Sequence, residues 1–277
     1  MKRLIFCGGA AMTCVLSASA QFSAWLPDAH QIIVTPSYAY QTFDEFWLGR
    51  DKMDLSDDVN QHTTLLTLEY GITERLAADA TVGYTWVDST DAFGSGDEDD
   101  GLTDTTFGLR YKLLDQDSEG WPMWPNIAVR VGGIIEGSYD ENLPFSAGDG
   151  ASGAEASLLL SRAICPNFGL FGDVGYRYRD GDVPDDLFGS AGAYVAFYGF
   201  TLSGAYRHVQ GLDGDDIGDP GFSFPEVKEV NQNVEVGLAY RDGGGRYYQL
   251  FYAHTVDGRN TGEKDIFGVS ASFSFGH

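Results

Sequence analysis

Apolar and polar side chains alternate along most of this chain in segments of about ten residues, each followed by a polar break rich in glycine or aspartate. Between residues 76 and 86, Val82 and Tyr84 fall in one set, whereas Asp79 and Thr81 fall in the other. Successive side chains of a β-strand point to opposite faces, so this alternation predicts strands with one apolar and one polar face. A soluble β-sandwich with its apolar faces turned inward fits the same pattern.

The N-terminus favours a different architecture. Lys2 and Arg3 precede an apolar run over residues 4–16 and then Ala18-Ser19-Ala20, the form of an export signal that is cleaved after Ala20. The apolar run is too short to span a membrane as a retained helix. We therefore assign residues 1–20 to a signal peptide, 21–30 to a short periplasmic N-terminal segment and 31–277 to a β-barrel in the bacterial outer membrane.

The alternation and the breaks together predict about twelve strands in a single all-β, antiparallel transmembrane barrel with both termini in the periplasm. The segment 187–197 alternates poorly, and without it the number falls to ten. The predicted strands are 31–41, 60–70, 76–87, 103–113, 126–136, 154–162, 168–179, 187–197, 200–209, 230–241, 246–256 and 264–275.

Short and long connections alternate between these strands, as they do in bacterial outer-membrane barrels. The short ones are 71–75, 163–167, 198–199 and 242–245, and the long, predominantly acidic ones are 42–59, 88–102, 137–153 and 210–229. Three connections depart from this rule. The connection 114–125 is long where a periplasmic turn is expected, and 180–186 and 257–263 are brief where external loops are expected.

The last predicted strand has the form of an outer-membrane closing strand. Phe273 and Phe275 alternate with serines and lie close to the C-terminus. We expect these two aromatic residues to act as the signal that the outer-membrane assembly machinery reads. A face lined by hydroxyl groups opposite an aliphatic and aromatic face suits a barrel with a wet lumen, because such a face is unfavourable in a soluble core.

The composition restricts the partners. The chain has 17 Lys+Arg against 41 Asp+Glu, a formal net charge of -24, which excludes nucleic acid as a partner. Of its 3 cysteines, only Cys165 follows the signal, so no intrachain disulfide can form in the exported chain. The acidic loops are expected to be solvated or to lie among lipopolysaccharide and outer-membrane lipid. The run Asp97-Glu98-Asp99-Asp100 lacks the spacing of a calcium loop, so no metal site and no cofactor is predicted.

Three stretches carry a resemblance to a known family: GLTDTTFGLRYKLL at 101–114, GYRYRDGDVPDDL at 175–187 and HTVDGRNTG at 254–262. They resemble the outer-membrane transporter family associated with meta-pathway phenol degradation, within the transmembrane β-barrel superfamily. In that family the strand at 126–136 runs into Pro-Thr-Gly, whereas this chain has Ile135-Glu136-Gly137. The resemblance implies an outer-membrane channel for small solutes, with aromatic or hydrophobic compounds as the suggested class.

Catalysis is the alternative that the histidines leave open. An outer-membrane hydrolase needs a serine–histidine or aspartate–histidine pair near the rim. The chain contains His30, His62, His208, His254 and His277, none within a G-x-S-x-G motif. Packing at the rim or the membrane interface explains them as well, so no catalytic residue is predicted and the protein is not expected to be an enzyme.

Charged residues on the polar faces of the strands are the candidate pore-lining residues. A charge that faces lipid at the membrane midplane costs roughly 2–4 kcal/mol, so these side chains should point into the lumen. They form either a structural lattice of salt bridges or a transverse field that orients solutes in the pore. The candidates are Glu69, Arg110, Lys112, Arg130, Glu136, Glu155, Asp173, Arg177, Arg179, Arg207, Glu235 and Arg241.

The sequence thus predicts an outer-membrane channel or transporter for passive uptake of small solutes. An outer-membrane hydrolase with an active site at the rim is the first alternative, and a structural or adhesion barrel is the second.

Overall fold

A computed structural model describes residues 24–88, 98–116, 124–139, 148, 150–220 and 226–276. The proposed signal peptide, Cys7, Cys14, His277 and most of the acidic run at 88–100 lie outside these residues. The described residues form strands and turns, and among them there is no helix long and apolar enough to cross a membrane. The strands are β1 (Ile32–Leu48), β2 (Asp51–Thr73), β3 (Leu76–Asp88), β4 (Glu98–Leu102), β5 (Thr105–Leu114), β6 (Asn126–Ile135), β7 (Gly153–Cys165), β8 (Phe168–Arg179), β9 (Asp186–Phe197), β10 (Phe200–Gly211), β11 (Val230–Arg241), β12 (Tyr247–Arg259), β13 (Thr261–Gly262) and β14 (Asp265–Phe275).

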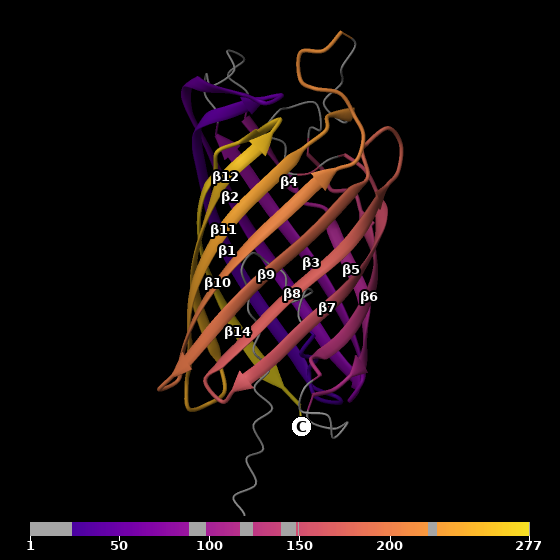
Figure 1. Ribbon diagram of the computed structural model, residues 1–277, viewed down its shortest axis with the longest axis vertical. Coiled ribbons are helices and arrows are strands. Elements are labelled where there is room, and N and C mark those ends of the chain that lie inside the picture. Colours follow the sequence, from indigo (N-terminus) through magenta and orange to yellow (C-terminus); the bar gives the residue numbers. More distant parts are fainter. Residues whose placement is uncertain are drawn as a thin grey trace, which may run out of the picture.

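Twelve of these strands close into an antiparallel barrel (Figure 1). Each strand pairs with its neighbour in the sequence, and β1 closes the barrel by pairing with both β2 and β14. The short β4 pairs with residues 84–88 of β3, and the two-residue β13 pairs with β1. Neither forms a further strand of the barrel wall. The predicted fold class is confirmed. Closure removes the free edges that an open sheet would expose.

The predicted segment 187–197 is a full strand, β9, so the count of twelve holds and the fallback of ten is wrong. Its alternation is weak because two aromatic side chains point inward, where Phe188 and Tyr194 are 4% and 7% exposed. Glycines of β8 make the room, since a Cβ atom on Gly175 would meet the Phe188 ring and one on Gly169 would meet Tyr194. Inward aromatic residues opposite glycines hide the period of two that identifies a strand.

The segment 42–59 is not a loop, contrary to the prediction. Strands β1 and β2 continue through it and reverse at Gly49, whose φ of 59° lies in the left-handed region. A small hydrophobic cluster supports this extension, formed by Phe43, Phe46, Val59 and Val87, with Leu55 and Ile217 packed against it. The acidic residues therefore stand on an extended β-hairpin. The acid-rich composition predicts a loop because the frequent acidic residues obscure the alternation of these apolar positions.

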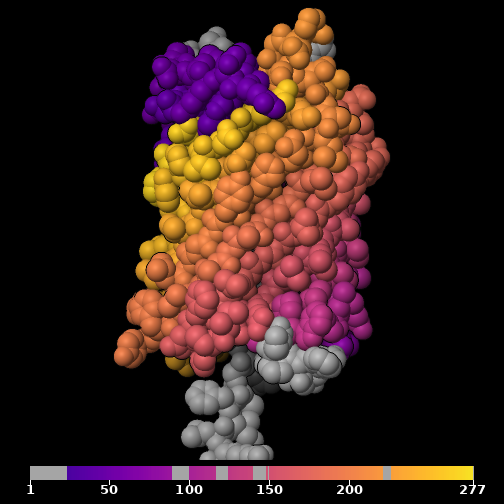
Figure 2. Space-filling model, viewed as in Figure 1, coloured from indigo at the N-terminus to yellow at the C-terminus, as the bar shows by residue number. Residues whose placement is uncertain are grey.

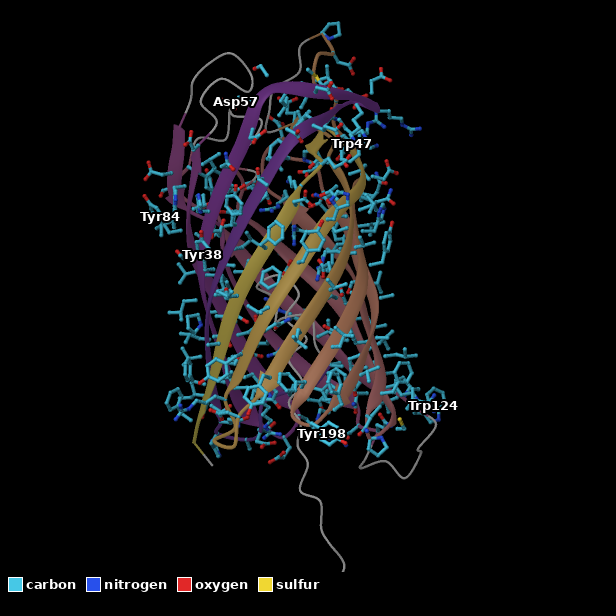
Figure 3. All side chains as sticks on the ribbon, turned by 90° about the vertical axis from the view of Figure 1, so that its left-hand side faces the viewer. Tyr38, Trp47, Asp57, Tyr84, Trp124 and Tyr198 are labelled. Carbon is cyan, nitrogen blue, oxygen red and sulfur yellow. The ribbon has the colours of Figure 1, made fainter. Side chains whose placement is uncertain are left out.

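The short turns and the C-terminal strand end lie at one end of the barrel, and the β1–β2 hairpin extends from the other (Figure 1). We call these the short-turn end and the hairpin end. Tyr198 and Gly199 form the turn between β9 and β10, both with positive φ, as a type I′ hairpin turn requires. Tyr198 is 99% exposed there, and Trp124 lies at the same end, whereas Trp47 and Asp57 mark the hairpin end (Figure 3).

The two faces of the wall differ as the alternation predicts. On β5, Leu109 is 47% exposed on the outside, whereas the adjacent Arg110 is fully buried on the inside. Outward side chains of neighbouring strands pack into diagonal rows over the outer wall (Figure 2). The outer wall is therefore predominantly aliphatic and aromatic, and the charged side chains of the strand interiors lie within the barrel.

The chain before β1 packs against the inner wall. Ala24 and Leu26 form a buried cluster with Ala77, Ala128 and Leu159, which come from β3, β6 and β7. The Trp25 ring makes an edge contact with Tyr194 of β9, with 5.9 Å between ring centroids. The described part of the predicted N-terminal segment 21–30 thus occupies space inside the barrel near its short-turn end.

Candidate functional site

A lattice of charged side chains covers part of the inner wall. Arg110 on β5 binds Glu69 of β2, and its Nε lies 3.3 Å from Asp79 Oδ1 of β3. Arg130 on β6 reaches Asp79 from the other side, with 2.7 Å between Nη2 and Oδ2, and also binds Glu155 of β7. Arg110 is 0% and Arg130 is 1% exposed. Each buried cation thus contacts two carboxylates, which compensates for its lost hydration.

The lattice continues from Glu155 toward β9. Arg177 on β8 lies 3.3 Å from Glu155, measured from Nε to Oε2, and its Nη1 lies 3.6 Å from Asp186 Oδ2. Acidic and basic groups alternate along this path from β2 to β9. The ion pairs join adjacent or next-but-one strands, so they run along the wall rather than across the lumen.

Two glycines make room for this arrangement. A Cβ atom on Gly108 of β5 would lie 2.7–2.9 Å from guanidinium atoms of Arg130, and one on Gly132 would lie 2.9 Å from Arg130 Nη1. The guanidinium therefore lies against backbone positions that have no side chain. These close approaches explain why glycines interrupt strands that otherwise favour larger residues.

A second charged group lies on β8 to β11. Arg207 Nε is 3.3 Å from Glu235 Oε1, and Asp173 accepts a hydrogen bond from the Ser190 hydroxyl. The side chains of Arg177 and Arg207 are 23% and 17% exposed, unlike those of Arg110 and Arg130. The four arginines predicted to share one interior thus differ in accessibility: two are sealed in the wall and two reach open space.

Several buried acceptor atoms on the inner wall have no protein partner among the described residues. They include Glu69 Oε2, Asp173 Oδ2, Asn233 Oδ1 and Thr255 Oγ1. Because a buried polar atom without a partner is unfavourable, water or a polar solute group is expected to bond these atoms.

The remaining predicted residues lie toward the ends of the barrel. Arg179 at the end of β8 binds Asp104, with 2.9 Å between Nη1 and Oδ2. Lys112 pairs with Asp115 at 3.1 Å near the short-turn end. Glu136 is exposed just beyond β6, and Arg241 is exposed at the end of β11. Glu136 and Arg241 therefore lie outside the shielded lattice.

Sequence reasoning missed several acidic members of these groups. Asp79 links the two sealed arginines, Asp186 ends the lattice, and Asp104 holds Arg179. Asp79 stands in the polar set of its strand, so the period of two could have identified it. Asp104 stands in the polar set of the predicted strand 103–113, so the same period could have identified it, whereas Asp186 lies at a break, where alternation gives no direction to a side chain.

Three of the four described histidines contact tyrosines or acids, and the buried Nδ1 of the fourth, His208, has no hydrogen-bond partner among the described residues. His62 Nδ1 lies 2.7 Å from the Tyr38 hydroxyl, and the His62 ring stacks on Trp86. His254 Nδ1 lies 3.0 Å from Asp265 Oδ1, and His30 lies 3.3 Å from the Tyr70 hydroxyl. None of these pairs contains a serine. Within the described part of the chain, no group of three or more His, Cys, Asp or Glu side chains is arranged to hold a metal ion.

Comparison with known proteins shows which solved structures share this fold. No family model matches the sequence, and neither does any curated protein. Among solved structures, an outer-membrane channel from Pseudomonas putida F1 superimposes with a TM-score of 0.73 at 16% identity, covering 94% of this chain and 100% of that one. The fold is that of an outer-membrane β-barrel. The NanC and KdgM porins are more distant, with TM-scores of 0.51 and 0.50 at 10% identity, each over 87% of this chain and 98% and 99% of theirs.

Proposed function

We propose that this protein is an outer-membrane channel for passive uptake of small solutes. The observation that carries the proposal is the closed barrel with an apolar outer wall and a charged inner wall. Such a wall can face hydrocarbon outside and water inside. The shared fold with outer-membrane channels supports the same conclusion.

The chemistry of the inner wall favours small solutes with an aromatic or hydrophobic part. Phe188, Tyr194 and Phe251 are packed into the inner wall, whereas Trp25, which lies against Tyr194, is only half-buried there. Aromatic side chains bind flat apolar solutes through stacking and edge contacts, while nearby charges and unpaired acceptors bind their polar substituents. This agrees with the class that the resemblance to the phenol-degradation transporters implies.

Liposome swelling with the purified barrel tests the proposal. Swelling in small sugars, amino acids and phenolic solutes should exceed that of protein-free liposomes, and small aromatic solutes should enter faster than sugars of similar mass. The same preparation should release no fatty acid from phospholipid vesicles. Lipid hydrolysis without swelling would favour the hydrolase, and the absence of both would favour the structural or adhesion barrel.

The two classes of arginine give a sharper test in planar bilayers. Arg177→Gln and Arg207→Gln each remove a positive charge that reaches open space. The reversal potential of both variants should therefore shift in the direction of greater cation selectivity. Arg110→Gln is the matched control, because its guanidinium is sealed in the wall. It should lower stability and leave selectivity near that of the parent. Equal selectivity in all three variants would mean that ions do not pass beside this wall.

A further inference from the structure

The outer wall carries an apolar groove of about 630 Å³ that crosses β10, β11, β12, β14 and β1. These five strands are neighbours in the barrel and lie side by side at the front of the view in Figure 3. One margin is a row of aromatic side chains from three neighbouring strands, Phe200, Tyr240 and Tyr248, with the first two ring centroids 4.9 Å apart. Phe200 directly follows the turn at Tyr198 and Gly199, so the groove lies near the short-turn end.

The groove is hollow because two small side chains lie among large ones. Ala271 pairs with Tyr248, and Pro36 stands opposite Ala271 on β1, between the register pairs Val34↔Phe273 and Ser37↔Ser270. Proline has no N–H to donate, so the β1–β14 ladder is interrupted there. Leu250 lines the groove on the side away from the turns. The surface is thus a hydrocarbon-lined slot with one end directed at the β11–β12 turn.

Arg246 stands at that end. Arg246 is 57% exposed, and its side chain hydrogen-bonds Tyr248, which itself lines the groove. Arg241, on the other side of the same turn, belongs to the inward face, where its guanidinium lies 5.3 Å from the centre of the Tyr247 ring. The chain contains only 17 basic residues against 41 acidic ones. Arg246 Nε also lies 4.0 Å from Asp242 Oδ2, and the other N–H groups of this exposed guanidinium remain available to an anion at the end of the apolar slot.

We propose that the groove binds an acyl chain of an anionic phospholipid in the periplasmic leaflet, with Arg246 bonding the lipid phosphate. The apolar slot suits a hydrocarbon chain, and a guanidinium suits a phosphate at the membrane surface. The inference rests on the outer-membrane location proposed above and does not depend on conduction. It assigns the short-turn end to the periplasmic side, where the leaflet consists of phospholipid.

Native mass spectrometry of the full barrel tests the site. The barrel is first purified in a detergent that removes bound lipid. The protein is titrated separately with phosphatidylglycerol, phosphatidylethanolamine and inorganic phosphate. We expect one phosphatidylglycerol to be retained with higher affinity than phosphatidylethanolamine. Arg246→Gln should weaken phosphatidylglycerol binding about tenfold, as loss of one charge-assisted hydrogen bond implies, and reduce the preference. Ala271→Leu, which fills the slot, should weaken both lipids equally.

Two matched controls separate the site from general lipid adhesion. Arg75→Gln removes an exposed arginine at the turn between β2 and β3, and Ala80→Leu enlarges an outward alanine on β3. Both should bind lipid like the parent. Heat-modifiable mobility on gels checks that each variant folds. If Ala271→Leu does not fold, Ala271→Val is used in its place.

Three results would overturn the proposal. The first is equal lipid retention in Ala271→Leu and Ala80→Leu. The second is that inorganic phosphate competes with phosphatidylglycerol while the Ala271 variants leave lipid binding unchanged. The third is a dimer that Ala271→Leu dissociates, because a second copy would then occupy the groove. Liposome swelling by the same variants should match the parent, so a failed channel and a failed lipid site give different results.

Discussion

At the residue scale, the central feature is the burial of Arg110 and Arg130 within the wall. Both lie on polar faces that the period of two identifies. Their burial is tolerable because Glu69, Asp79 and Glu155 surround them with opposite charge. A buried ion pair is weak evidence of net stabilisation, but removing one partner leaves the other charge buried and uncompensated. The lattice therefore makes each member sensitive to substitution.

Arg130→Gln should lower the free energy of unfolding by about 3–5 kcal/mol, because Asp79 and Glu155 would lose a shared cation in a buried setting. Urea titration in detergent, followed by heat-modifiable mobility and tryptophan fluorescence, measures the change. Arg75→Gln, at an exposed turn, should stay within about 0.5 kcal/mol of the parent. Equal midpoints for the two variants would contradict the lattice.

At the element scale, the β1–β2 hairpin depends on contacts with the chain after β10. Arg259 Nε lies 2.6 Å from Asp216 Oδ1, and Asn260 Nδ2 donates to the same oxygen at 2.9 Å. Asn260 Oδ1 accepts from the Gly49 amide at the hairpin turn, at 2.8 Å. One aspartate thus links the loop after β10, the end of β12 and the hairpin turn.

This linkage should weaken in acid. The hydrogen bond from Arg259 lowers the pKa of Asp216 below its usual 3.8, and Asn260 acts in the same direction against the effect of burial. A carboxyl whose pKa is lowered by folding contributes stability above the unfolded value and loses it as the pH falls through the folded value. Hydrogen exchange, corrected for intrinsic rates, should therefore show Gly49 and Ile217 losing protection below about pH 4.

Asp216→Asn is the matched control for this pH dependence. It should reduce protection of the same amides at neutral pH and leave little further loss on acidification. If the parent and Asp216→Asn lose protection in parallel, another group controls the hairpin.

The closing strand β14 presents Phe273 and Phe275 near its end, and Phe275 is 55% exposed. Phe275 pairs with Ile32 and Phe273 with Val34 of β1, so both lie at the seam of the barrel. Replacing both with Asp should leave unfolded protein in the periplasm, because the proposed assembly signal would be lost and two charges would face hydrocarbon. Ser272→Ala, on the inward face of β14, should assemble normally. A heat-modifiable band at parental yield in the double variant would contradict this role.

At the scale of the whole molecule, the two ends differ in shape and charge. The hairpin end carries the extended β1–β2 hairpin with Asp51, Asp54, Asp57 and Asp58, and the short-turn end carries exposed arginines. In the proposed orientation, the acidic hairpin end lies outside the cell and the short-turn end lies in the periplasm.

Epitope tags test this orientation. Gly218 and Gly243 stand at opposite ends, and a Cβ atom at either would have no neighbour within 4 Å, so both sites should accept an insertion. A tag after Gly218 should label on intact cells, whereas a tag after Gly243 should label only after the outer membrane is permeabilised. Labelling of the Gly243 tag alone on intact cells would invert the barrel.

The sequence by itself predicted about twelve strands, the direction of Arg110, Arg130, Arg177 and Arg207, and the closing strand, and left open whether 187–197 is a strand. These follow from a period of two, which depends only on local backbone geometry. The tertiary structure decided what depends on neighbours distant in the chain. It showed that Asp79 joins two arginines, that Arg177 and Arg207 remain accessible, and that 42–59 is a hairpin supported by Ile217. It also created the outer groove, because Pro36 and Ala271 are separated by almost the whole chain and meet only when the barrel closes.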